Sequence, residues 1–471
     1  MHRPTSLTEL AAVFGATADG RSCRIDDGEA DAPICLEGVR AERLELTGCD
    51  VDGPLLLRDC FIDDLRLSGC AAEGIVIAGC HVQRLVIRNL PPGSGVSVSE
   101  GDYERISIHD VGEISLDAIE CQGGVTVTGI RGQVELNRVT AKSVSLGEQL
   151  TAAPDVRIRL SRVRVMDNLE IHDLRVLAVD LRDCLVDRNL RLRRLSATGQ
   201  VVLDDVRCEG RLFLGGVTSR AAILITGSTL RDGLEGERLR SPADGSPVLT
   251  LTGSAVGSSI GVTLATQPGE VILRDTAVDG RLTFPAPSPR YRIEGVTTIG
   301  DVQLPPTPVG STARLRELAD RHFGESGATA YGVLRAAFAV RQRMREEDLC
   351  YFLQRHAEVR FLPWHRRWLG RYVLGGVLGW GVSIVPPVRA LSLGILVTGL
   401  VLTATGAGKA VSPGDLPAGL TLAAALWFNV GTGLPQGLGT GRWTALAVTF
   451  TVTGLLLVTI IVGITIRRLV R

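Results

Sequence analysis

The strongest constraint on the fold is a short apolar pattern that recurs about every ten residues between positions 34 and 304. In each unit, an apolar residue, a variable residue and a second apolar residue precede a polar or glycine-containing pair. Four early units end in cysteine, and they are Leu44–Cys49, Leu55–Cys60, Leu65–Cys70 and Ile75–Cys80. An alternation with a period of two is typical of a short strand with one face turned inward.

Many short strands at a regular spacing indicate either a sandwich or a solenoid. A sandwich would not keep one frame over about twenty-five consecutive units, whereas the stacked coils of a solenoid align equivalent residues. We therefore expect an all-β right-handed β-helix over residues 34–310, with about 13 coils if two units form one coil. The pattern resembles the pentapeptide-repeat proteins and related quadrilateral β-helix proteins of bacteria, and the resemblance implies a fold rather than a function.

Residues 1–33 are expected to form an N-terminal cap with one short helix. Ser6 and Glu9 have the spacing of a capping box, and the apolar residues Leu7, Leu10, Ala11 and Phe14 follow the period of a helix. A cap would cover the first coil, whose exposed strand edges otherwise invite pairing with other chains. No apolar stretch of signal-peptide length opens the sequence, so we expect a cytoplasmic β-helix with reduced thiols.

Two features of the β-helix suggest chemistry, and each has a simpler interpretation. Cys49, Cys60, Cys70 and Cys80 lack the paired spacing of a zinc site, so a buried structural ladder is predicted. Clustered carboxylates are found in enzymes that cleave polysaccharides, but Asp50, Asp52, Asp59, Asp63 and Asp64 occupy bends where aspartate is favoured. We expect no enzymatic activity, no catalytic residue, no cofactor and no metal site.

Charge divides the chain near residue 310. Residues 1–310 carry a net charge of −10 and residues 311–471 a net charge of +10. An acidic rod can mimic nucleic acid and occupy a DNA-binding protein, but basic residues such as Arg157, Arg159 and the segment Arg188–Arg194 interrupt the acidic surface. A mixed, solvated surface is the preferred interpretation, with a protein as the partner of the β-helix and nucleic acid not expected.

The composition changes at Pro305–Pro308, which ends the repeats. Residues 311–371 follow a helical period, with Leu315, Leu334 and Leu353 among the apolar positions. The same segment contains a high density of arginines close to an apolar C-terminal region. Basic residues beside a membrane segment favour the cytoplasmic side, where anionic lipids attract them. Residues 311–371 are therefore predicted to be a basic helical linker next to a membrane.

Residues 372–471 have the composition of a membrane domain. Residues 390–408 and 443–466 are two uncharged stretches close to the length of about 20 residues needed to cross a bilayer. Arginines flank both outer ends, which places the β-helix and both termini in the cytoplasm of a protein integral to the inner or plasma membrane. Residues 372–388 are glycine-rich and end in two prolines, so an interfacial elbow is expected rather than a third span.

Residues 416–440 lie between the two spans and comprise a short apolar helix over residues 416–428, too short to cross, and a glycine-rich loop. The order of span, short helix, glycine loop and span is that of a pore-loop cation channel, in which loop carbonyls replace the hydration shell of the ion. The candidate pore-loop residues are Trp427, Phe428, Asn429, Gly431, Gly433, Gly437, Leu438 and Gly439.

This layout resembles the two-span potassium-channel-like domain that follows a pentapeptide-repeat region in some bacterial membrane proteins. The resemblance implies a filter at Gly437–Gly439 or, in a second register, at Asn429–Gly433. Leu438 occupies the place of the tyrosine in the family's filter. The segment Gly379–Gly381, with Pro386 and Arg389, is similar to the elbow before the family's first span.

Two functions from different classes follow from these patterns. The first is a membrane channel or channel-like protein, which would be a homo-oligomer, a tetramer if it is a channel, because one pore loop cannot enclose a pathway. The second is a membrane-tethered scaffold whose β-helix presents ladders of side chains to a protein partner. Both place the lipid bilayer among the partners of the chain.

Overall fold

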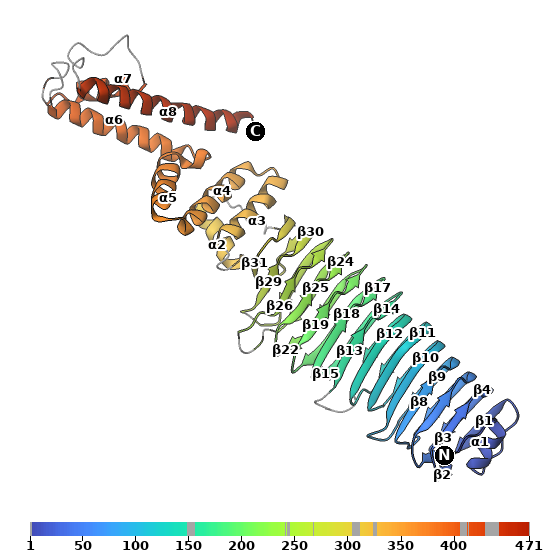
Figure 1. The fold of residues 1–471 in the computed structure, drawn as a ribbon. Coiled ribbons are helices and arrows are strands. Elements are labelled where there is room, and N and C mark those ends of the chain that lie inside the picture. The colour runs from blue at the N-terminus through green and yellow to red at the C-terminus, as the bar shows by residue number, and fades with distance from the viewer. Residues whose placement is uncertain are drawn as a thin grey trace. The chain divides into compact units, whose positions relative to one another are not determined.

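The computed structural model describes residues 2–147, 156–240, 242, 245–266, 268–303, 311–323, 327–405, 412, 414–428 and 442–470. These residues form two compact units. The first contains helix α1, the β-strands and the last residues of helix α2, and the second contains the other helices (Figure 1).

The first unit is a parallel β-solenoid, which confirms the fold expected from the repeat (Figure 1). Ile34 pairs with Leu55, Leu55 with Ile75, and Ile75 with Val96, so each strand pairs with its equivalent one coil later. Two ten-residue units therefore form one coil, and the solenoid has about 13 turns. Because both neighbours of an inner strand belong to the solenoid, the backbone groups of that strand are satisfied within it.

The strands line two main sides and a set of corners. The first side contains β3 (Ile34–Glu37), β6 (Leu55–Arg58), β8 (Gly74–Ala78), β13 (Arg157–Ser161), β16 (Ala178–Arg182), β19 (Val201–Asp204), β23 (Ile223–Thr226), β26 (Leu249–Thr252), β29 (Glu270–Arg274) and β31 (Arg290–Glu294). The second contains β1 (Ser22–Asp26), β4 (Arg40–Thr47), β7 (Phe61–Ser68), β9 (His81–Arg88), β15 (Leu169–Val176), β18 (Leu190–Ala197), β21 (Leu212–Gly215), β25 (Leu234–Leu239), β28 (Ser259–Leu264), β30 (Ala277–Thr283) and β32 (Thr298–Val302).

Three long strands bend around a corner and belong to both sides, and they are β10 (Gly95–His109), β11 (Glu113–Thr128) and β12 (Gln133–Gly147). The remaining strands are two residues long: β2 (Glu29–Ala30), β5 (Asp50–Val51), β14 (Arg164–Val165), β17 (Leu185–Val186), β20 (Arg207–Cys208), β22 (Thr218–Ser219), β24 (Thr229–Leu230) and β27 (Ala255–Val256).

The core of the solenoid consists of the apolar residues of the repeat. Leu44 and Leu46 point inward and are fully buried, whereas Glu45 between them is only partly buried. After such a strand the chain bends through a residue with positive φ, such as Gly48 at 63° and Asp59 at 49°. Glycine, asparagine and aspartate tolerate this left-handed conformation best. The pair that follows each apolar triplet in the sequence is therefore the bend itself.

The cysteines of the early units form two ladders rather than the single column predicted from their spacing. Cys49 and Cys70 are hydrogen-bonded neighbours in one ladder, and Cys60 and Cys80 are neighbours in the other. The backbone N–H of Cys60 donates to Cys80 Sγ over 3.4 Å. The physical reason is that successive units lie on different sides of a two-unit coil, so only alternate cysteines stack.

Helix α1 (Leu7–Val13) packs against β1 in the first unit. Ser6 is its N-cap, and the side chain of Ser6 accepts a hydrogen bond from the backbone N–H of Glu9. Glu9 in turn accepts from the backbone N–H of Thr5 at 2.7 Å. Leu7 and Leu10 are buried. The predicted short helix and its capping residues are confirmed.

The second unit is helical. Its elements are α2 (Thr312–Phe323, whose last residues belong to the first unit), α3 (Gly327–Val340), α4 (Met344–Glu358), η1 (Val359–Phe361), α5 (Trp364–Trp368), η2 (Leu369–Val377), η3 (Gly379–Gly381), α6 (Val385–Thr405), α7 (Leu416–Phe428) and α8 (Arg442–Val470). Leu315, Leu334 and Leu353 are buried, in agreement with the helical period of the sequence.

Candidate functional site

Two helices of the second unit are long and apolar enough to cross a membrane, and they comprise Val385–Thr405 and Thr444–Arg467. Large apolar side chains such as Leu393, Val397, Val452 and Leu456 are exposed along them. In water this exposure would be unfavourable, whereas in a bilayer these faces contact lipid. The two apolar stretches of the sequence are thus confirmed as long helices.

A third apolar helix, α7, is too short to cross. At 1.5 Å per residue its 13 residues extend about 20 Å, against about 30 Å of hydrocarbon. It contacts both α6 and α8. Asp415 caps its first turn, because Asp415 Oδ1 accepts a hydrogen bond of 3.2 Å from the backbone N–H of Ala418. The bounds predicted for the short helix, residues 416–428, are those of α7.

Trp427 fixes the C-terminal end of α7 to both long helices. Its side chain is buried, and its Nε1 donates a hydrogen bond of 3.0 Å to Oγ1 of Thr398 on α6. On the other side its ring stacks on Phe450 of α8, with centroids 5.9 Å apart and planes at 19°. Thr451 of α8 donates through Oγ1 to the carbonyl of Leu426 over 3.0 Å. The last turn of α7 is therefore held by polar and aromatic contacts from two directions.

Glycines allow this close packing. Gly394 of α6 faces the Trp427 ring, and Gly454 of α8 faces the backbone carbonyl of Trp427, so a Cβ at either position would collide with those atoms. Gly399 faces Leu420 of α7, where an added Cβ would lie 2.7 Å from Cδ2. Small residues at helix crossings are how helices approach one another in lipid.

The structure describes only two of the eight candidate pore-loop residues. Trp427 and Phe428 end α7, with Trp427 buried and Phe428 exposed. The other six lie outside the described residues, and they are Asn429, Gly431, Gly433, Gly437, Leu438 and Gly439. The choice between the two filter registers therefore stays a matter of prediction.

The residues of α6 and α8 that hold Trp427 were not singled out from the sequence. Gly394 and Thr398 are one helical turn apart on α6, and Phe450 and Gly454 are one turn apart on α8. These two pairs are about fifty residues apart in the sequence and meet around Trp427 only when the helices pack. One signal was present: glycines and threonines recur in both apolar stretches, as they do at membrane helix interfaces. Which of them contact α7 depends on helix rotation, which periodicity alone does not fix.

A sharp bend precedes α6. Gly379, Trp380 and Gly381 all have positive φ, at 58°, 53° and 70°. This conformation is unfavourable for a side chain as large as that of tryptophan, and it is held here by packing. The Trp380 ring lies against Gly370 and Gly375 of η2. Pro386 and Pro387 follow in the first turn of α6, where a missing N–H leaves no helical bond unmade.

At one end of the second unit an ion pair joins α8 to α4, and the start of α6 lines a cavity beside this pair. Arg467 near the end of α8 pairs with Asp348 of α4 over 3.3 Å. A cavity of about 590 Å³ next to this pair is lined by α4 residues such as Phe352 and by Val385 at the start of α6. The beginning of α6 and the end of α8 thus lie at the same end of the helical unit.

The solenoid cysteines are buried thiols. Burial raises the pKa of Cys184 and of Cys208 to about 11, so both are protonated and unreactive at neutral pH. Within the described residues, no group of three or more His, Cys, Asp or Glu side chains is arranged to hold a metal ion.

Comparison with protein-family models, with curated proteins and with solved structures gives no match. The class of protein that the structure defines is therefore a β-solenoid followed by α-helices, two of which are suited to a membrane.

Proposed function

We propose that the chain is an integral membrane protein whose helices α6, α7 and α8 form a pore-loop-type, channel-like domain in a homotetramer. The observation that supports this most directly is the attachment of Trp427 to Thr398 and Phe450. It anchors a short apolar helix between two long ones, and the glycine-rich segment 431–439 follows directly. In a pore-loop domain a short helix of this kind holds the filter at a fixed place.

The oligomer follows from the surfaces left uncovered. Only 28% of the apolar stretch in α6 and 17% of that in α8 are buried within one chain. The rest must contact lipid or neighbouring copies. A pathway lined by backbone carbonyls needs several loops around an axis, and cyclic symmetry supplies them. Four copies are the number expected for a channel with the two-span, pore-loop layout that this sequence resembles.

For the orientation, we place the β-solenoid and both ends of the chain on the cytoplasmic side. Arg366, Arg367 and Arg371 precede α6, Arg389 is near its start, and Arg467 is near the end of α8. Arginines of this density favour the cytoplasmic side of a membrane. The pair between Arg467 and Asp348 supports one common side for the two flanks, because it joins the end of α8 to the linker helix α4.

The test is to reconstitute the full chain in liposomes and measure cation flux, after its mass in detergent is determined by light scattering. A tetramer with flux that is lost in Gly437→Val and Gly439→Val, or in Gly431→Val and Gly433→Val, supports a filter in that register. Unchanged flux in all four variants excludes both registers. A monomer without flux excludes the channel and leaves a membrane anchor.

A second candidate function is a membrane-tethered scaffold without enzymatic activity. It is favoured by a basic hollow on the solenoid that the membrane domain does not need. In this case α6, α7 and α8 would only hold the solenoid at the membrane, and a partner would bind the solenoid surface.

A further inference from the structure

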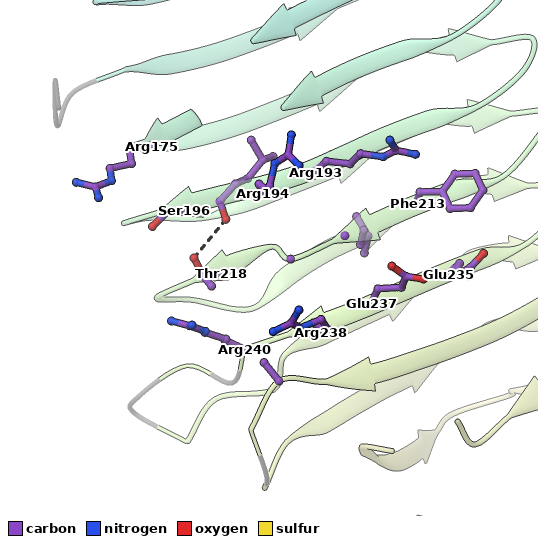
Figure 2. Close-up of a pocket in the computed structure, with 15 residues that line it drawn as sticks. Arg175, Arg193, Arg194, Ser196, Phe213, Thr218, Glu235, Glu237, Arg238 and Arg240 are labelled. Carbon is purple, nitrogen blue, oxygen red and sulfur yellow. Dashed lines mark hydrogen bonds between the residues drawn. The ribbon is translucent and has the colours of Figure 1, made fainter. Parts of the chain in front are cut away.

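A hollow of about 720 Å³ lies on the second side of the solenoid, over strands β18, β21 and β25 (Figure 2). Five arginines from neighbouring coils line it, and we call it the arginine trough: Arg175, Arg193, Arg194, Arg238 and Arg240. All five side chains are exposed. Figure 2 shows Arg193 and Arg194 along one edge of the trough and Arg238 and Arg240 along the opposite edge, with Thr218 between them. We call these two edges the banks of the trough.

The trough exists because one outward side chain is missing. Arg193, Gly215 and Glu237 are in register on successive coils, so they form one outward column. Gly215 leaves a gap in the middle of that column. The two banks, two strands apart, are separated by about 10 Å, which is wide enough for a single extended chain. A second hollow of about 590 Å³ shares Glu235, Glu237 and Arg238 with the first, so the depression is elongated.

The trough is positive on a unit of opposite charge. Its lining has five arginines and two glutamates, although residues 1–310 carry a net charge of −10. Arg194 pairs with Asp173. For Arg193, Arg238 and Arg240, in contrast, no ion pair or side-chain hydrogen bond to another described residue is found. Three guanidinium groups are therefore available to an external anion.

One end of the trough offers an aromatic surface, the ring of Phe213 (Figure 2). Arg191 and Arg211 both lie over the ring of Phe213, each with Cζ 5.7 Å from the ring centroid. They also form ion pairs, with Glu170 and Glu235 respectively. These contacts fix the ring between two strands, where it can pack against an apolar side chain of an occupant.

We propose that the arginine trough binds an acidic peptide segment of a partner protein. Guanidinium groups bind carboxylates through paired, charge-assisted hydrogen bonds. Alternate side chains of an extended peptide are about 6.6–6.8 Å apart, so its carboxylates can reach the arginines on one bank and avoid the glutamates. A nucleic acid fits less well, because its continuous row of phosphates would pass Glu235 and Glu237.

This site is on the solenoid and does not depend on whether the membrane helices conduct. Failure of peptide binding would leave the channel proposal intact, and absence of flux would leave the trough intact. Peptide binding would deepen the scaffold alternative by naming the chemistry of its partner.

The experiment measures fluorescence anisotropy of a labelled peptide of alternating Glu and Ser, added to the full chain in detergent. The combined variant Arg193→Gln, Arg238→Gln and Arg240→Gln should weaken binding at least about tenfold, since each lost charged hydrogen bond weakens binding substantially. The matched control combines Arg157→Gln, Arg159→Gln and Arg164→Gln, three exposed arginines outside the trough. This control variant loses the same amount of positive charge, and its affinity for the acidic peptide should stay within about twofold of that of the original chain.

A second variant, Gly215→Leu, tests the shape without changing any charge. An added Cβ at Gly215 meets only Arg193 Cγ at 3.7 Å, an ordinary contact, so the strand accepts a side chain there. The leucine would occupy the trough and should weaken peptide binding. Equal weakening by the trough and control variants would overturn the proposal, as would binding of a Gln–Ser peptide with the same affinity. Binding of oligothymidylate but not of the acidic peptide would overturn the assignment of the occupant.

Discussion

Trp427 donates its indole N–H to the hydroxyl of Thr398 at 3.0 Å, and both residues are buried between apolar helices. Buried polar groups between apolar helices have no water molecule as an alternative hydrogen-bond partner. The indole N–H and the hydroxyl therefore rely on each other for this hydrogen bond. The bond joins the end of α7 to the middle of α6, immediately before the segment that would form the pore loop. The C-terminal end of α7 is therefore held by this hydrogen bond, by the stacking of Phe450 on the Trp427 ring and by the hydrogen bond from Thr451 to the Leu426 carbonyl.

Thr398→Val tests the bond itself. Valine keeps the shape of threonine but leaves the indole N–H without its acceptor, which should cost about 1 kcal/mol and lower the thermal midpoint in detergent by a few degrees. The control is Thr449→Val on α8, whose side chain is exposed and whose hydroxyl donates, among the residues that the structure describes, to the carbonyl of Ala445 in its own helix. Equal midpoints for the two variants would contradict a stabilising role for the pair.

Gly454→Ala tests the close approach of α8 to α7. A methyl group there would collide with the Trp427 carbonyl, and relieving the clash by moving the helix should cost about 1–3 kcal/mol. Gly463 is in the same helix and has no atom within 4 Å of an added Cβ. Gly463→Ala should therefore leave the melting temperature unchanged or raise it. A matching loss of stability in both variants would contradict the packing explanation, because alanine favours a helix more than glycine does and only the Gly454 variant places a methyl group against another atom.

Much of the fold could be predicted because its signals are local. The alternation of Leu44, Glu45 and Leu46 and the bend at Gly48 recur in every early unit, so the solenoid was evident from the sequence. Length and lack of charge were enough to predict α6 and α8, and α7 begins and ends at the predicted residues. These predictions required no knowledge of which elements pack together.

The contacts between distant residues could not be predicted in the same way. A repeat of about ten residues does not say how many units close a coil, so the single cysteine column predicted from spacing became two ladders. The arginine trough requires that Arg193, Gly215 and Glu237 fall in register on three successive coils. The Trp427 contacts likewise depend on how three helices rotate. The cysteine ladders, the trough and the Trp427 contacts can be derived only when the coil length or the helix packing is known.

The ion pair between Asp348 and Arg467 is expected to couple α4 to the end of α8. Asp348 is mostly buried, with 16% of its side chain exposed, but Arg467 is 37% exposed, so solvent screens the pair. A double-mutant cycle with Asp348→Asn and Arg467→Gln should give a coupling of about 0.5–1 kcal/mol in thermal unfolding. Arg467→Lys keeps the charge and should retain part of it. Strictly additive effects would contradict an energetic contribution from the pair.

The stability of the solenoid should fall at alkaline pH because burial keeps the thiols of Cys184 and Cys208 protonated. The pKa of Cys184 and of Cys208 is raised by burial from 9.0 to about 11. A raised pKa in the folded state means that the stabilising effect is complete below pH 9 and is lost as the pH rises through 11. Each thiol should account for on the order of 2 kcal/mol across that window.

The measurement is the urea midpoint of the strand signal in circular dichroism, recorded between pH 8 and pH 12. It should stay level up to about pH 9 and then decrease, because the unfolded chain ionises its thiols first. Cys184→Val with Cys208→Val should make the decrease shallower. Part of it should remain, since burial also raises the pKa of Tyr103 and Tyr291. A midpoint that stays level to pH 11 in the original chain would show that the buried thiols are free to ionise in the folded solenoid.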